Sequence, residues 1–122
     1  MRGLAVLQWV GLLAGAALWG FAHIVGYGVT EAACSPVGAR WSLNFDRWQW
    51  LTNGISALLV LGGLAAAALV VLGTGSSSYE AAPPVGRMRF FAIAALIANL
   101  LFLAMIVLYL VGTVANTPCR QA

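Results

Sequence analysis

Three long apolar runs constrain this chain more than any other feature. They extend roughly from Leu4 to Val29, from Trp48 to Leu72 and from Phe90 to Val114. Each run holds about 25 residues, and a helix needs only about 20 to cross a bilayer. Of the 122 residues, 62% are hydrophobic and 7% are charged. The sequence therefore predicts an all-α membrane protein with three transmembrane helices, at about 4–29, 48–72 and 90–114, in a single transmembrane domain spanning residues 1–122.

The first apolar run lies near the N-terminus, where a cleaved signal peptide would also be apolar. It is longer than the apolar region of a signal peptide, and Glu31 stands where a lipoprotein cleavage box needs a small or aliphatic residue. We therefore expect the first helix to be retained in the mature protein.

The connection of residues 30–47 differs in character from the second connection. It intersperses apolar side chains such as Trp41 and Phe45 with charged ones, which predicts a short segment lying along the membrane interface. Asp46, followed three residues later by Gln49, predicts an N-cap pair for the second helix. The second connection, at about 74–88, is rich in Gly, Ser and Pro and predicts a flexible cytoplasmic linker.

The two cysteines indicate the orientation, which the evenly divided arginines do not. Cys34 follows the first helix and Cys119 follows the third, so three crossings place both on the same side of the membrane. Two cysteines on one side suit an oxidising compartment. We expect a Cys34–Cys119 disulfide in the periplasm and the N-terminus in the cytoplasm of a bacterium, with unpaired thiols as the alternative.

Several polar side chains interrupt the apolar runs. Because a polar side chain facing lipid is costly, we expect each to face another helix and to find a partner there. The predicted interhelical polar contacts are His23, Tyr27, Gln49, Asn53, Asn99 and Tyr109. Most of these would lie at similar depth in the outer leaflet.

His23 is the one side chain that suggests cofactor chemistry. A neutral histidine bonded to Tyr27 or Asn53 accounts for it without any ligand. The alternatives are a haem or metal ligand, a quinone contact or a member of a proton relay. The chain has no second histidine, and the cysteines lie outside the bilayer, so the sequence predicts no metal site and no cofactor of its own.

Small residues predict where the helices pack closely. Gly11 and Gly15 form a small-xxx-small pattern, and Gly62 and Gly63 precede a run of alanines in the second apolar stretch. Such faces let backbones approach one another.

Several of these residues carry a resemblance to a family. Trp19, His23 and Tyr27 with their neighbouring glycines, the segment 87–90 that enters the last helix, and the closing segment 117–119 resemble small multi-helix membrane proteins encoded with bacterial haem-copper cytochrome c oxidases. Relatives often have a proline before the tryptophan and an aspartate before the final Pro-Cys, where this chain has alanine and threonine. The resemblance implies association with a respiratory complex in the bacterial inner membrane, whose haem or copper belongs to the partner.

Nothing in the sequence supports catalysis by this chain alone, since no nucleophile is paired with a base and no carboxylate pair lies in an apolar run. We expect an accessory subunit that contacts lipid and the transmembrane subunits of a larger complex, with no nucleic-acid partner. The alternatives are an assembly factor that holds copper or haem through His23, Cys34 and Cys119, and a haem-bearing subunit that uses His23.

Overall fold

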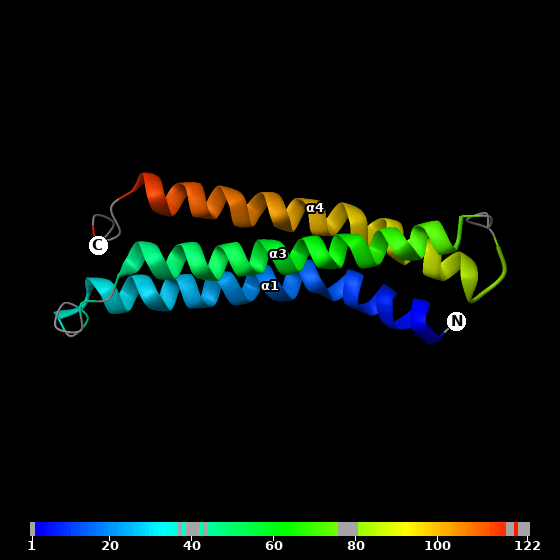
Figure 1. The fold of residues 1–122 in the computed structure, drawn as a ribbon, viewed down its shortest axis with the longest axis horizontal. Helices are drawn as coiled ribbons and strands as arrows, with labels where there is room; N and C mark the ends of the chain where they lie inside the picture. The colour runs from blue at the N-terminus through cyan, green and yellow to red at the C-terminus, as the bar shows by residue number, and fades with distance from the viewer. Residues whose placement is uncertain are drawn as a thin grey trace.

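The computed structural model describes residues 2–36, 38, 42, 44–75, 81–116 and 119, and it is built from three long α-helices (Figure 1). They are α1 (Arg2–Cys34), α3 (Phe45–Gly73) and α4 (Val85–Ala115). All three are long and apolar enough to cross a membrane. The expected all-α architecture with three spans is therefore confirmed.

Each helix is longer than the apolar run that predicts it. The first continues through residues 30–34 to Cys34, and the third begins at Val85, inside the segment predicted as a linker. Apolar residues mark the part of a helix that lies in hydrocarbon, whereas backbone hydrogen bonding continues until a breaker stops it. Pro84 supplies that boundary ahead of α4. Trp41, in the predicted interfacial segment, lies outside the described residues.

The start of α3 corrects the predicted N-cap. Asn44 occupies the cap in an extended conformation, and its side-chain oxygen accepts a hydrogen bond of 3.1 Å from the backbone nitrogen of Arg47. Asp46 instead lies in the first turn, where its negative charge suits the positive end of the helix dipole. Gln49 is 1% exposed and turns into the bundle, so it does not pair with the cap.

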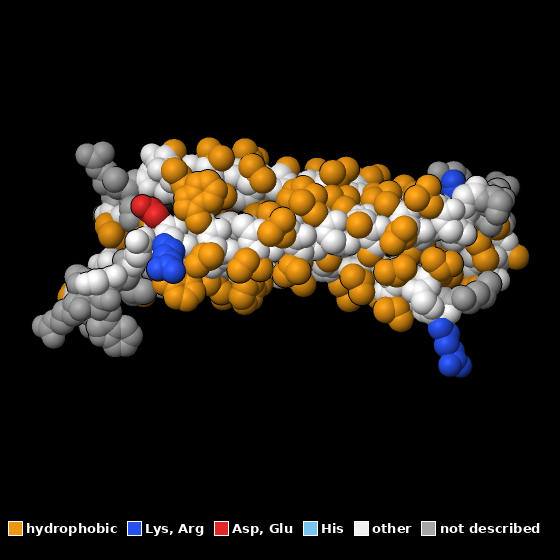
Figure 2. Space-filling model, viewed as in Figure 1, with side chains coloured by type: hydrophobic (Ala, Val, Ile, Leu, Met, Phe, Trp, Pro, Cys, Tyr) orange, Lys and Arg blue, Asp and Glu red, His pale blue; other side chains and the backbone are white. Residues whose placement is uncertain are grey.

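The three helices run side by side in alternating directions. Helix α1 ends, α3 begins and α4 ends at one end of the bundle, hereafter the disulfide end, while the N-terminus lies at the other (Figure 1). On the face shown in Figure 2, apolar side chains cover the long middle, and the arginine and acidic side chains lie towards the two ends. This distribution is the one a membrane span requires.

Small residues bring the helices close together. The buried residues of α1 are all glycine or alanine: Gly11, Gly15, Ala22 and Gly26. A Cβ at Gly11 would lie 3.2 Å from the Cα of Ala67 in α3, so the two backbones are in contact there. The predicted small-residue face of the first helix is thus the face that α3 and α4 cover.

Polar contacts also close the end of the bundle opposite the disulfide end. The hydroxyl of Thr74 donates to the carbonyl oxygen of Val70 at 2.8 Å and caps the end of α3. Arg89, at the start of α4, donates from Nη1 to the carbonyl oxygen of Thr74 at 2.7 Å. A cation beside the carbonyl end of α3 is favourable because that end carries partial negative charge.

Candidate functional site

A disulfide joins Cys34, the last residue of α1, to Cys119 beyond the end of α4. The two Cα atoms lie 5.5 Å apart, although 85 residues separate them in the sequence. The predicted pairing is therefore present in the structure. It fastens α1 to the chain segment that follows α4.

Two buried amides join other helices to α1, and both bind a glycine carbonyl. Gln49 of α3 donates from Nε2 to the carbonyl oxygen of Gly26 at 3.1 Å. Asn99 of α4 donates from Nδ2 to the carbonyl oxygen of Gly11 at 2.6 Å. A helix carbonyl is normally shielded by neighbouring side chains, and a small-residue face leaves it open to a second donor. The sequence predicted contacts for both amides but not their acceptors.

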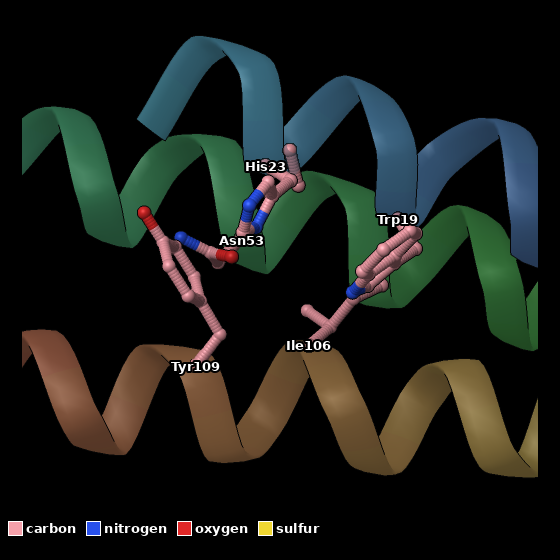
Figure 3. A pocket seen from close by; sticks show the side chains of 6 residues that line it. Trp19, His23, Asn53, Ile106 and Tyr109 are labelled. Carbon is pink, nitrogen blue, oxygen red and sulfur yellow. The ribbon is translucent and has the colours of Figure 1, made fainter. Parts of the chain in front are cut away.

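Asn53 is completely buried, yet only half of its amide is bonded. Its Nδ2 donates to Gln49, to the backbone oxygen at 2.9 Å and to Oε1 at 3.1 Å. Its Oδ1 is buried without a hydrogen-bond partner among the described residues. Figure 3 shows this oxygen pointing towards the space between His23 and Ile106, with the nitrogen pointing the other way. The hydrogen bonds of Asn53 thus stay within α3, and the interhelical contact predicted for it is not formed among the described residues.

Aromatic rings line the interface between α1 and α4. The ring of Trp19 stacks on that of His23 with 5.4 Å between centroids, and it lies 5.9 Å from the ring of Phe102. The ring of His23 in turn lies 5.5 Å from that of Tyr109. His23 is nevertheless exposed on one side, and within the described part of the chain its nitrogens make no hydrogen bond. His23 and Tyr109 thus meet through their rings rather than through polar atoms.

These side chains surround a small hollow whose volume of about 140 Å³ includes space open to the surroundings. Its lining residues, five of which are labelled in Figure 3, are Trp19, Ala22, His23, Asn53, Ile106 and Tyr109. The space is too narrow to enclose a water molecule. Ligand pockets usually measure about 300 to 1,000 Å³, so the hollow does not fit a porphyrin or a quinone ring.

Tyr27 is placed differently from the other predicted polar contacts. Its side chain is 64% exposed and lies on the outside of the bundle, and it makes no hydrogen bond with any described residue. Four residues of helix exceed one full turn by about 40°, so the direction rotates steadily along Trp19, His23 and Tyr27. By Tyr27 it has left the buried face, which Gly26 occupies at that level.

Two observations concern the alternative of copper handling by His23, Cys34 and Cys119. Across the described residues, no three histidine, cysteine or acidic side chains come together as a metal site would require. Both cysteines are used by the disulfide, and a bonded sulfur is not the thiolate that binds a metal. The disulfide favours a structural role for Cys34 and Cys119 over copper handling.

The fold and the site together define a class, that of small three-helix membrane proteins. Side-chain amides bound to glycine carbonyls join the helices, and a disulfide links the chain at one end of the bundle. Comparison with protein-family models, with curated proteins and with solved structures finds no match to this chain.

Proposed function

We propose that this chain is a non-catalytic accessory subunit that packs against the transmembrane helices of a larger membrane complex. One observation carries the proposal. Two of the buried polar side chains, Gln49 and Asn99, join helices, and the hollow beside His23 is too small for a cofactor. Such an interior supports a role in holding the three helices together.

The outer faces support the same proposal. In the most apolar 18-residue stretch of each helix, 11% of residues are buried for α1, 33% for α3 and 22% for α4. A bundle this slim presents most of its apolar surface outward, where lipid or other transmembrane helices cover it. Large side chains such as Leu58 on α3 and Leu108 on α4 are 69% and 70% exposed.

We further propose a terminal oxidase or a respiratory supercomplex of the bacterial inner membrane as the larger complex, with haem or copper held by the partner. The support for this partner is the resemblance of the residues around His23, the entry to the last helix and the closing segment 117–119. The disulfide supports a periplasmic position for the disulfide end, and hence a cytoplasmic N-terminus, because disulfides persist in oxidising compartments.

Co-purification tests the proposal. The full chain with an affinity tag is expressed in its host, the membranes are solubilised in a mild detergent, and the terminal oxidase is isolated through its own subunits. The chain is expected to elute with the oxidase in a fixed ratio to haem. Its absence from the oxidase, and from any supercomplex that contains it, would refute the respiratory partner.

Two matched variants locate the docking face. Leu58→Trp and Leu108→Trp each enlarge an outward side chain on a different helix without touching the bundle interior. One is expected to reduce the amount of chain that co-purifies, and the other to leave it unchanged. Equal retention of both would show that neither face is used.

A further inference from the structure

Helix α1 carries a second regular face besides its buried one. Residues spaced alternately by four and three positions form the α1 outer seam, which consists of Trp9, Leu13, Ala16, Gly20, His23 and Tyr27. Trp9, Leu13 and Tyr27 are 58%, 56% and 64% exposed and face away from α3 and α4, while His23 lies at the edge of the seam, where its ring also contacts Tyr109 of α4. One step of four and one of three make seven residues, and this heptad spacing is the one with which two helices pack in a left-handed coiled coil.

The middle of the seam leaves room for close approach. A Cβ at Gly20 would meet no atom within 4 Å, and Ala16 is exposed one turn away. Small residues at such a position let a second helix come near enough for side chains to interact across the interface. Small residues alone do not identify what covers the seam. The unbonded polar groups beside it indicate the chemistry of the partner.

The polar groups beside the seam are incomplete in a single chain. Asn53 Oδ1 is a buried acceptor without a donor, and His23 has a donor and an acceptor nitrogen that no described residue uses. Both line the hollow between α1 and α4. Leaving such groups unbonded in hydrocarbon costs free energy, so a donor from outside is favourable.

The chain itself offers the missing donor. The hydroxyl of Tyr27 is exposed and makes no hydrogen bond with a described residue. Side chains on a helix lean towards its N-terminus, so the phenol of Tyr27 covers the turn that holds His23. In two parallel copies related by a two-fold axis along the membrane normal, Tyr27 of one copy therefore reaches the depth of His23 in the other.

We propose that a second copy of this chain packs against the α1 outer seam. Tyr27 of that copy donates its hydroxyl hydrogen to an imidazole nitrogen of His23, and the other imidazole nitrogen donates to Asn53 Oδ1. The same contacts form twice by symmetry. The small volume of the hollow favours this occupant, since a single hydroxyl reaches its mouth where a ring does not fit. The proposal does not depend on a respiratory partner, because it concerns the purified chain alone.

The test measures association of the full chain in lipid vesicles by energy transfer between two differently labelled preparations. Wild type is expected to form dimers whose fraction rises with the protein-to-lipid ratio, and this dependence gives the dissociation constant. Tyr27→Phe removes only the hydroxyl. Because the contact forms twice, the dimer loses two interhelical hydrogen bonds of about 0.6 to 1.7 kcal/mol each, which corresponds to a dissociation constant raised about eightfold to three-hundredfold.

A matched glycine pair separates the seam from the rest of the surface. Gly20→Leu places a large side chain on the seam and is expected to abolish the dimer. Gly62→Leu places the same side chain on the outside of α3, where a Cβ also meets nothing within 4 Å, and is expected to leave the dimer intact. Both variants should keep the Cys34–Cys119 disulfide, which verifies the fold of each chain.

Four outcomes would count against the proposal. The first is a wild-type chain that stays monomeric at about one chain per hundred lipids. The second is a dimer that Gly62→Leu disrupts and Gly20→Leu does not. The third, which would refute the hydroxyl contact, is a Tyr27→Phe variant with unchanged association and an unchanged ¹⁵N signal from the His23 imidazole. The fourth uses a photoreactive residue in place of Ile24, which is 73% exposed and next to His23 of the seam. If it captures a different protein in native membranes and never a second copy, the seam belongs to that protein.

Discussion

The side-chain nitrogen of Asn99 lies 2.6 Å from the carbonyl oxygen of Gly11 and joins the middle of α4 to α1. The same nitrogen also donates to the carbonyl oxygen of Ala95 within its own helix at 2.8 Å. The side-chain oxygen faces Gly15, where a Cβ would lie only 2.6 Å away. One amide thus occupies the space that two glycines of α1 leave open.

Replacing this amide tests its contribution to stability. Asn99→Ala removes the bond to Gly11 and leaves a small cavity, and we expect the free energy of unfolding to fall by about 1 to 2 kcal/mol. Reversible unfolding in mixed detergent micelles measures it. Asn116→Ala is the control, because Asn116 is exposed and, among the described residues, its side-chain amide bonds only to the carbonyl of Gly112 in the same helix. Equal losses in both variants would show that the interhelical bond contributes nothing.

The glycine beneath that amide should tolerate substitution poorly. A Cβ at Gly15 would lie 2.6 Å from Asn99 Oδ1 and 2.8 Å from Cδ2 of Phe102, so Gly15→Ala must displace these side chains or α4 itself. Overpacking of this kind costs about 1 to 3 kcal/mol. Gly62→Ala adds the same methyl group where nothing lies within 4 Å and should leave stability unchanged or slightly raised, since alanine favours helix. Equal unfolding midpoints for the two variants would contradict this packing.

Much of this architecture could be predicted from the sequence, because the bilayer demands long apolar helices and penalises unbonded polar groups. The length of the apolar runs gave the three spans, and the position of Cys34 and Cys119 after two helices of the same direction gave the disulfide. The direction of individual side chains could not be predicted in the same way. Tyr27 follows His23 by four residues, yet the added rotation of the helix carries it to the outside.

The sequence also could not show which groups accept hydrogen bonds from the buried amides. Gln49 and Asn99 are visible in the sequence as polar residues among apolar ones, whereas their partners are backbone oxygens that every residue carries. Only the packing of α1 shows which carbonyls are open. A signal was present nonetheless, because the two acceptors, Gly11 and Gly26, both belong to the glycine-rich face.

The contact between Arg89 and the end of α3 makes a separate prediction. Arg89→Gln keeps part of the side chain's length but removes the charge that favours the carbonyl end of α3, and we expect a loss of about 0.5 to 1.5 kcal/mol. Arg87→Gln is the matched control, since Arg87 is exposed two residues away. Hydrogen exchange should quicken at the last turn of α3 in the first variant only. Faster exchange in both variants would indicate a general effect of charge at this end.

Reduction of the disulfide should loosen one end of the molecule and leave the rest in place. Treating the closed loop as a flexible chain gives a contribution of about 4 to 5 kcal/mol, which is an upper limit because membrane insertion already restrains both helices. We therefore expect the Cys34→Ser, Cys119→Ser double variant to remain inserted and helical, with a loss below that limit. Its faster hydrogen exchange should be confined to the disulfide end of α4.

The bond between Asn99 and Gly11, which lies towards the middle of the bundle, should keep its protection from exchange. Wild type should react with a maleimide only after reduction. Labelling of both cysteines in the unreduced protein, or uniform loss of protection along α4, would contradict this account of how the two helices are held together.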